Sequence, residues 1–448
     1  MDDPVFLARM QFALTIGFHF LFPPISIGLA WLLVVVEGMA WKTGDEAWEQ
    51  AGRFFAKLLA LTFAVGVATG IVMEFQFGTN WSQYSKFVGD IFGAPLAAEG
   101  VFAFFLESGF LGLYLFGRGR VSRPLHWFAI LMVAVGATLS AFWIIVANSW
   151  QQTPAGYLLN EAIGRVELTD FWAAVFNPST TIRFTHTVLA ALVAGAFFMA
   201  SISAVLLRRK HDNPSARRTM KVAVIVGFFA SLFVAFPTGH EHAKKVAHTQ
   251  PEKFAAMEAL YKTQREAPLV TFGLVQERPP RLKARVELPI KGLLSSMAFG
   301  DPKAEVKGID AFPAGDVPPL WMTFVSFHNM VILGMLFIFL MLLGLVQLAR
   351  GKLWTSRKLL TIFKWALPLP LVACEFGWTV AEVGRQPWAV YHLLRTQEAV
   401  SVTVGAGEIW FSMILLLLIY LMLLGVYLFL LARETAHGPA PVAGKEVA

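Results

Sequence analysis

The sequence is poor in charged residues and almost free of cysteine. Only 15% of its 448 residues are Asp, Glu, Lys or Arg, and 56% are hydrophobic, whereas soluble domains carry roughly 25% charged residues. Because this is too little charge to cover a water-facing surface, most of the surface must face lipid. The single cysteine, Cys374, excludes a disulfide framework and any metal site built from several cysteines.

Other absences narrow the function. No two histidines are adjacent, and the apolar runs hold no dense set of histidines, so a heme–copper oxidase is not expected. The chain has no Gly-rich loop ending in Lys of the type that holds ATP phosphates, which argues against ATP-driven transport. The net charge of +7 does not indicate nucleic-acid binding, because the Lys and Arg residues lie between apolar runs. The N-terminus begins with acidic residues and no small-residue cleavage site, so we expect its first apolar run to be a retained helix.

The most prominent feature that is present is a series of long apolar runs. A helix needs about 20 mostly apolar residues to cross a bilayer, and nine runs meet or approach that length, the sixth being the shortest. We therefore predict an all-α polytopic membrane protein with about nine transmembrane helices. The predicted spans are 11–36, 58–77, 93–116, 127–147, 182–207, 222–237, 320–348, 359–380 and 409–432.

The distribution of basic residues predicts the orientation. Residues 1–237 would hold the first six helices, 238–319 a polar extramembrane loop, 320–432 the last three helices and 433–448 a tail. Because Lys and Arg mark cytoplasmic connections, we expect the N-terminus and the loop outside and the tail in the cytoplasm. The connections rich in Lys and Arg are 37–57, 117–126, 208–221 and 349–358, together with the tail.

Ionisable residues inside the predicted spans are the candidate functional groups, because a charge in hydrocarbon is costly. Lys364 lies near the inner end of its span, where its side chain is expected to reach the interface. The others, including one just beyond the end of its span, are His19, Glu74, Glu99, Glu107, Arg183, His186, His328, Glu375 and Glu382.

Four of these residues share a depth. At 1.5 Å per residue, His19, His186, Glu99 and Glu382 all fall in the outer half of the membrane. Histidines that merely pack have no reason to share a level, whereas ligands of a common cofactor layer do, and neutral imidazole binds heme iron well. Glu99 and Glu107 lie about 12 Å apart along one helix, which suits proton transfer, although a hydrogen-bonded pair between helices remains an alternative.

Two further functional classes stay open from these residues. A proton-coupled transporter could use His19, Glu99 and Glu107 as a relay, and a membrane anchor could carry two b hemes without oxygen chemistry. A reduced-minus-oxidised spectrum separates these hypotheses, because a transporter has no heme bands and an anchor has only low-spin ones.

Several stretches, taken together, resemble subunit I of the cytochrome bd-type quinol oxidases. They occur in the same order as in that family and cover most of the chain. GRQPW after a span, together with the other stretches, makes the resemblance highly specific. The stretches are GFHFLFPPISIGLAW, TGIVMEFQFGTNW, PLAAEGVFAFFLES, FWIIVANSWQQTPAGY, RFTHTVLAA, QPEKFAAMEA, SFHNMVILG and WTVAEVGRQPW.

The resemblance implies three hemes. His186 and Met330 would be the axial ligands of a low-spin heme b. His19 and Glu382 would each ligate one member of a pair, a high-spin heme b and either a heme d or a heme b in its place, where oxygen is reduced to water. Which of the two residues holds which heme stays open. The cofactor-binding residues implied by the motifs also include Trp378, Arg385 and Gln386.

The resemblance also implies the proton and quinol sites. Glu107 and then Glu99 would carry protons from the inside, with Glu74 nearby, and Lys253 and Glu258 of the outer loop would bind quinol. Quinol oxidation outside and proton uptake from inside would separate charge without pumping. The implied partners are a second membrane subunit, subunit II, and a small single-helix subunit, in a bacterial inner membrane.

The chain departs from the pattern of the family at two places. His328 stands two residues before Met330, where the family usually has Arg, and residues two apart face different sides of a helix. We favour Met330 as the ligand and expect His328 to contact a heme propionate or quinol. His240, His242 and His248 stand where the pattern often has an Asp, and a solvated loop is the alternative for them. The loop is short, as in the cyanide-insensitive branch of the family.

Overall fold

The structure of the protein, a computed structural model, describes residues 3–276, 281–287 and 290–440. Over these residues, nine helical segments are long and apolar enough to cross a membrane. This confirms the predicted all-α polytopic fold. The segments are Pro4–Thr43, Glu46–Thr79, Ser82–Phe116, Arg123–Gln152, Thr180–Arg209, Pro214–Thr249, Leu320–Ala349, Arg357–Glu382 and Ala406–His437. Part of the predicted tail, 441–448, lies outside the described residues.

Four of the nine segments are interrupted by breaks, π-helical turns or prolines. The first consists of α1 (Pro4–His19) and α2 (Pro23–Thr43), and the eighth of α14 (Arg357–Trp365) and α15 (Pro368–Glu382). The third consists of α4 (Ser82–Ala98), η1 (Glu99–Phe104) and α5 (Phe105–Phe116). The sixth consists of α9 (Pro214–Phe233), η2 (Val234–Gly239) and α10 (His240–Thr249). The unbroken spans are α3 (Glu46–Thr79), α6 (Arg123–Gln152), α8 (Thr180–Arg209), α13 (Leu320–Ala349) and α17 (Ala406–His437).

The breaks fall beside candidate functional residues. His19 is the last residue of α1, and the chain bends there because Pro23 and Pro24 provide no backbone N–H for a continuous helix. Glu99 begins the π-helical segment η1, and η2 contains Pro237. Such π segments occur frequently at functional sites.

The sixth span is longer than predicted. The helical path continues through η2 into α10 and ends at Thr249 rather than at residue 237. His240, His242 and His248 are therefore helical, and the solvated-loop alternative is wrong for the backbone of this segment. The charged composition of α10 hid the continuation, because apolar run length was the only criterion for a span.

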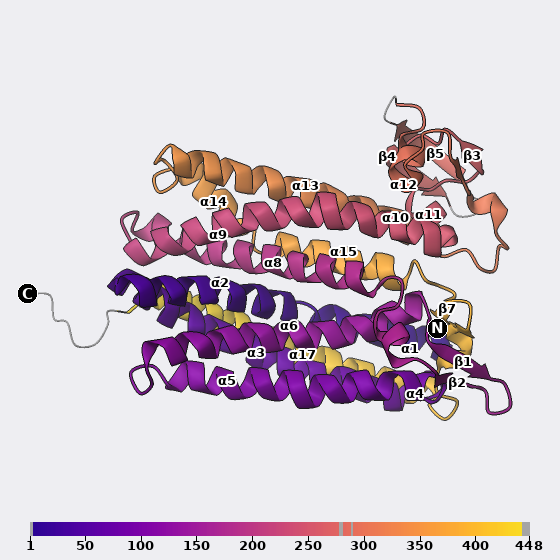
Figure 1. Ribbon diagram of the computed structural model, residues 1–448, viewed down its shortest axis with the longest axis horizontal. Helices are drawn as coiled ribbons and strands as arrows, with labels where there is room; N and C mark the ends of the chain where they lie inside the picture. The colour runs from indigo at the N-terminus through magenta and orange to yellow at the C-terminus, as the bar shows by residue number, and fades with distance from the viewer. Residues whose placement is uncertain (1–2, 277–280, 288–289, 441–448) are drawn as a thin grey trace, which may run out of the picture.

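Short elements cover the end of the bundle that carries the N-terminus (Figure 1). They include the helices α7 (Phe171–Val175), α11 (Pro251–Met257), α12 (Leu293–Phe299), η3 (Ile309–Ala311) and α16 (Thr396–Ala399). Four antiparallel strand pairs accompany them: β1 (Tyr157–Asn160) with β2 (Arg165–Leu168), β3 (Gln264–Arg265) with β6 (Glu305–Val306), β4 (Val270–Gln276) with β5 (Arg281–Glu287), and β7 (Trp388–Val390) with β8 (Leu394–Arg395).

We call this the loop end, and we call the opposite end, where α17 ends, the tail end (Figure 1). Between them the core depends on close helix approach. A Cβ at Gly28 of α2 would collide with the backbone of α8, and one at Gly195 of α8 would collide with α2. Small residues at such crossings let membrane helices pack backbone to backbone.

Candidate functional site

A cavity of about 1730 Å³ lies among the spans and extends towards the loop end. It exceeds the ~300–1,000 Å³ of a pocket for one drug-sized ligand. Every site residue predicted from the sequence lines it, although these residues come from six different spans and the outer loop. They are His19, Glu74, Glu99, Glu107, His186, Lys253, Glu258, Met330, Trp378, Glu382, Arg385 and Gln386.

His19 is held in one tautomer by α3. Its Nδ1 lies 2.9 Å from the hydroxyl oxygen of Thr69. When that hydroxyl donates to a carbonyl oxygen one turn earlier in α3, at 2.9 or 3.0 Å, its oxygen accepts from Nδ1–H of the histidine. The lone pair of His19 is thereby left on Nε2. Histidines that ligate a metal usually have their other ring nitrogen held by such a hydrogen bond, which orients the ring.

His186 has the same arrangement on a different pair of helices. Its Nδ1 lies 3.3 Å from the hydroxyl oxygen of Thr238 in η2. That hydroxyl donates to backbone carbonyl oxygens of the preceding turn at 3.1 and 3.3 Å, so it accepts from the histidine and leaves Nε2 with the lone pair. The ring of His242 lies 5.4 Å from that of His186 and also lines the cavity.

The structure distinguishes His328 from Met330. Both nitrogens of His328 face backbone carbonyl oxygens, 3.0 Å from that of Phe324 and 2.9 Å from that of Val270. The ring therefore ties α13 to β4, and it also lines the cavity, so the expected contact with a propionate or quinol stays a prediction. The Met330 sulfur lies 3.3 Å from where a Cβ of Gly377 would be, so this glycine leaves room for the thioether beside α15.

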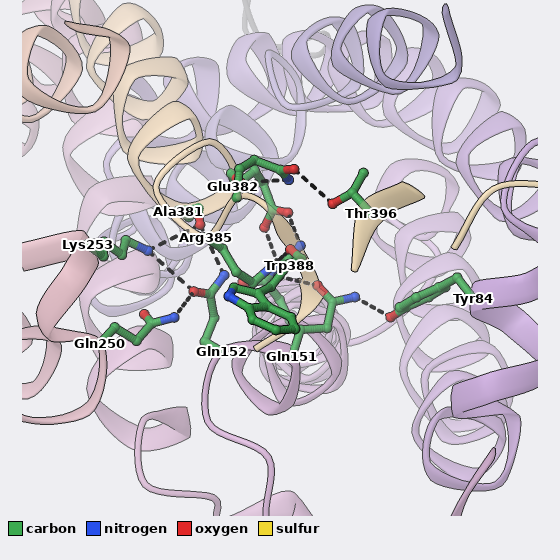
Figure 2. A network of polar contacts seen from close by, with 12 residues as sticks. Tyr84, Gln151, Gln152, Gln250, Lys253, Ala381, Glu382, Arg385, Trp388 and Thr396 are labelled. Carbon is green, nitrogen blue, oxygen red and sulfur yellow. Dashed lines mark hydrogen bonds and ion pairs between the residues drawn. The ribbon is translucent and has the colours of Figure 1, made fainter. Parts of the chain in front are cut away.

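Glu382 lies at the centre of a polar network at the end of α15 (Figure 2). Its Oε1 accepts from Asn148 Nδ2 at 2.8 Å, and its Oε2 pairs with Arg385 Nη2 at 2.6 Å. Arg385 also donates from Nη1 to Gln151 Oε1 at 2.6 Å, and Gln151 donates in turn to the Tyr84 hydroxyl. Carboxylates that ligate metals are commonly fixed by such hydrogen bonds.

Gln386 lies beside this carboxylate without touching it. Its Nε2 donates to the backbone oxygen of Glu382 at 3.3 Å, and its Oε1 accepts from Thr396 at 2.8 Å. Its contacts are therefore those of a residue that holds the turn after α15.

Lys253 reaches the same helix end from α11. Its Nζ donates to the backbone oxygen of Ala381 at 3.2 Å and to Gln152 Oε1 at 3.3 Å, and Gln250 donates to the same Gln152 oxygen at 3.0 Å (Figure 2). Lys253 is only 2% exposed. Burial, followed by the charge of Arg183, lowers the pKa of this lysine well below its usual range.

Glu258 is the second predicted quinol residue and is also buried. Burial raises the pKa of its carboxyl to about 8, and its Oε2 has no hydrogen-bond partner among the described residues. The side chain is therefore protonated at neutral pH and free to donate a hydrogen bond to a molecule in the cavity.

Three carboxylic acids line the other side of the cavity. Glu99 accepts a hydrogen bond from Ser140 of α6 at 2.6 Å, and Glu107, one segment further along the same span, is 8% exposed. Glu74 of α3 is exposed, although it lies inside a span, and it also lines the cavity. An exposed carboxyl at that depth needs a covering surface other than lipid.

The cavity has the properties that a porphyrin needs. Its lining is mainly apolar, but the Trp378 Nε1, Arg183 Nε and Glu375 Oε1 atoms are buried and lack partners in the described part of the chain. Buried polar atoms are normally paired, so a ligand with polar groups on a large apolar body fits. No three His, Cys, Asp or Glu side chains gather as a metal site within the described ranges, so a bound iron would need nitrogens of its own ring.

Sequence reasoning missed the amide side chains that hold the site. Gln151, Gln152 and Gln250 connect Arg385 and Lys253 to α6, and Tyr84 completes the chain of contacts (Figure 2). The available signal was the group of amides Asn148, Gln151 and Gln152 after the apolar part of the fourth span, which was read as a connection.

Comparison with known proteins gives consistent results. The chain matches the family described as cytochrome bd terminal oxidase subunit I over residues 7–439. It is 39% identical to cytochrome bd ubiquinol oxidase subunit 1 of Bacillus subtilis (strain 168), covering 96% of this chain and 93% of that one. It is 35% identical to cytochrome bd-II ubiquinol oxidase subunit 1 of Escherichia coli (strain K12), covering 100% and 99%. The solved structure of bd oxidase from Geobacillus thermodenitrificans superposes with a TM-score of 0.91 at 29% identity, covering 98% of this chain and 100% of that one.

Proposed function

This chain belongs to the cytochrome bd terminal oxidase subunit I family, and on that premise we propose that its cavity holds three hemes and meets quinol at the loop end. As a member of that family it is a subunit of a quinol:oxygen oxidoreductase. The observation that carries the proposal is that one cavity is lined by all four predicted axial ligands and by both predicted quinol residues.

The two histidines and their counterparts would hold the iron porphyrins. His186 and Met330 would hold a low-spin heme b, and His19 and Glu382 would hold a high-spin heme b and a heme d or second heme b. The support is the pair of threonine contacts that leave Nε2 available on both histidines. When bound, the hemes supply the redox chemistry by which quinol electrons reduce oxygen to water. Trp378 lies one turn before Glu382 on α15 and lines the same cavity.

Lys253 and Glu258 would bind the quinol head group. An ammonium group and a protonated carboxyl can both donate hydrogen bonds to quinol oxygens, and both are buried at the cavity wall. The bond from Lys253 to the backbone of Ala381 supports a site beside the helix end that carries Glu382.

Protons for water formation would come from the tail end through this chain. Glu107 and then Glu99 would carry them, with Ser140 fixing Glu99. Proton release at the loop end and uptake from the tail end would separate charge without a pump, with the loop end outside. Subunit II, and a small single-helix subunit, are the proposed partners in a bacterial inner membrane. A partner would cover the exposed Glu74.

Quinol-driven oxygen consumption by the purified complex, together with its reduced-minus-oxidised spectrum, tests this proposal. We expect low-spin and high-spin heme bands and oxygen uptake that depends on quinol. A preparation without heme bands would favour the transporter hypothesis, and one with only low-spin bands the anchor hypothesis. Either result would contradict the proposal.

A further inference from the structure

Three titratable side chains meet at the loop end, outside the spans and outside the cavity wall. Glu252 belongs to α11, and Tyr391 and His392 belong to the turn between β7 and β8. The Tyr391 hydroxyl donates to Glu252 Oε2 at 2.5 Å, and His392 Nε2 lies 3.6 Å from Glu252 Oε1. The side chain of Glu252 is 12% exposed and that of His392 is 52% exposed, so the cluster connects a buried carboxylate to solvent.

His392 is held in an unusual backbone conformation. Its φ is +57°, in the left-handed region that glycine and asparagine adopt more readily than other residues. Its ring stacks on Tyr391 at 4.0 Å between centroids and meets the edge of Trp388 at 5.2 Å. A strained residue that is fixed by several contacts suggests that its side chain has a use.

The cluster lies directly behind the proposed quinol site. Glu252 and Lys253 are consecutive in α11, so they point about 100° apart around the helix. Lys253 points into the cavity, and Glu252 faces Tyr391. The backbone N–H of Tyr391 donates to the backbone oxygen of Gln151 at 2.9 Å. This bond joins the turn to the end of α6 whose Gln152 contacts Lys253.

Quinol oxidation makes such a group necessary. Each quinol that becomes quinone loses two electrons and two protons. The electrons go to the redox centres of the enzyme, and the protons must reach water at the loop end. A buried lysine and a buried carboxyl at the quinol site have no direct contact with that water.

We propose that Glu252, Tyr391 and His392 form the proton-release group for quinol oxidation, an inference that rests on the proposed quinol site. Glu252 takes the proton on the α11 side, and His392 passes it to solvent. Tyr391 is a positioning residue. Burial, then the hydrogen bond to Glu252, raises the pKa of Tyr391 above its usual range, so it stays protonated and keeps the carboxylate oriented.

Few other charges surround the cluster in the described part of the chain. Asp316 influences Tyr391 but is paired with Arg395 at 2.6 Å, and Arg395 lies over the Trp388 ring at 4.4 Å. The exposed imidazole of His392 is thus the member of the cluster through which a proton can reach water.

The test uses His392→Asn and Glu252→Gln in the purified complex. Asparagine tolerates the left-handed conformation, so His392→Asn removes the ring while keeping the turn. His211→Asn, an exposed histidine at the tail end, is the matched control. Oxygen uptake is measured from pH 5.5 to 8.5 with quinol, in ordinary and heavy water, and with a one-electron donor that carries no proton, reduced tetramethyl-phenylenediamine.

We expect both cluster variants to lower quinol turnover about threefold, below the ~100-fold of a group that removes the proton directly. The dependence of quinol turnover on pH should change shape and the solvent isotope effect should rise, while turnover with the one-electron donor and in His211→Asn stays unchanged. An unaltered quinol pH profile overturns the proposal, and so does an equal loss with both donors, which would indicate a structural role. Lys253→Met tests the quinol site separately: unchanged quinol turnover in that variant would refute the site itself, whatever the cluster variants show.

Discussion

Two buried polar networks lie at opposite ends of the bundle and differ in how completely they are paired. At the tail end, Glu37 of α2 accepts from the Tyr114 hydroxyl at 2.9 Å and from Arg118, and its other oxygen lies 3.8 Å from His126 Nδ1. His126 Nε2 lies 3.0 Å from the backbone oxygen of Tyr114. None of these side chains lines the cavity, and among the described residues none has an unpartnered buried atom.

Other buried polar groups, towards the loop end, are incompletely paired. Arg183 Nε, Gln250 Oε1, Glu258 Oε2 and Trp378 Nε1 are buried without partners in the described ranges, and all but Gln250 line the cavity. A network that is complete by itself stabilises the fold, whereas one that is complete only with a ligand marks a binding site. The comparison assigns a structural role to the network around Glu37 and ligand binding to the unpaired groups that line the cavity.

The largest expected effect is on stability at the tail end. Glu37→Ala should lower the free energy of unfolding by about 3 kcal/mol, because removing one partner leaves Arg118 partly buried and unpaired. Thermal unfolding of the purified complex measures this, with the exposed Glu161→Ala as control. A wild-type melting temperature together with lost quinol oxidation would reverse the assignment of the two ends.

At the loop end, Lys253→Met should reduce quinol oxidation about 100-fold, the typical contribution of one positioned donor in an active site. Methionine fills the space of the buried lysine stem, so folding should be retained. Turnover with quinol and the heme spectrum are measured together. Loss of heme along with activity would instead assign Lys253 to cofactor binding.

A smaller effect on the rate of oxygen reduction distinguishes Glu107, which lines the cavity, from Glu37 of the tail-end network. Glu107→Gln should slow oxygen reduction about tenfold, less than the ~100-fold of a direct acid–base group, and leave all heme bands intact. Glu37→Gln should leave turnover unchanged. If oxygen reduction and proton uptake in Glu107→Gln equalled those of the wild type, the relay role would be lost.

The pH dependence of Glu258 gives the smallest change. With a pKa of about 8, its ionised fraction rises from roughly a tenth at pH 7 to half at pH 8, so its capacity to accept a quinol proton should rise about fivefold. The same raised pKa means that ionisation opposes folding, and stability is lost as the pH climbs from 4.5 towards 8. Glu258→Gln should flatten both the activity and the stability profiles over this range. Unchanged profiles would show that the carboxyl does not titrate there.

Apolar length predicted the spans, and ionisable residues in or next to them predicted the candidates His19, Glu74, Glu99, Glu107, His186 and Glu382. The other predicted residues that line the cavity, namely Met330, Trp378, Lys253, Glu258, Arg385 and Gln386, came from the resemblance to the family. Helical periodicity allowed only one of His328 and Met330 to face a given heme, and the resemblance to the family favoured Met330. The two carbonyl contacts of His328 support that choice. The extension of the sixth span was missed because α10 is polar. The tail-end network was missed because Glu37 follows the predicted first span, and only packing reveals that four segments enclose it.

The hydroxyl contacts of His19 and His186 also could not be read from sequence, since Thr69 and Thr238 lie about fifty positions away from their partners. The amide side chains around Arg385 and Lys253 are a similar case. Residue type indicates which groups can bind a heme or quinol, but the partners that fix their tautomer and orientation come from distant helices.

The most direct test of the central claim is the heme content of His186→Ala compared with that of Glu37→Gln, measured on purified complex by reduced-minus-oxidised absorption. The account predicts that His186→Ala lacks the low-spin heme b bands and that Glu37→Gln keeps the full wild-type spectrum. A full low-spin spectrum in His186→Ala would contradict the claim that the loop-end cavity is a heme site held by this histidine.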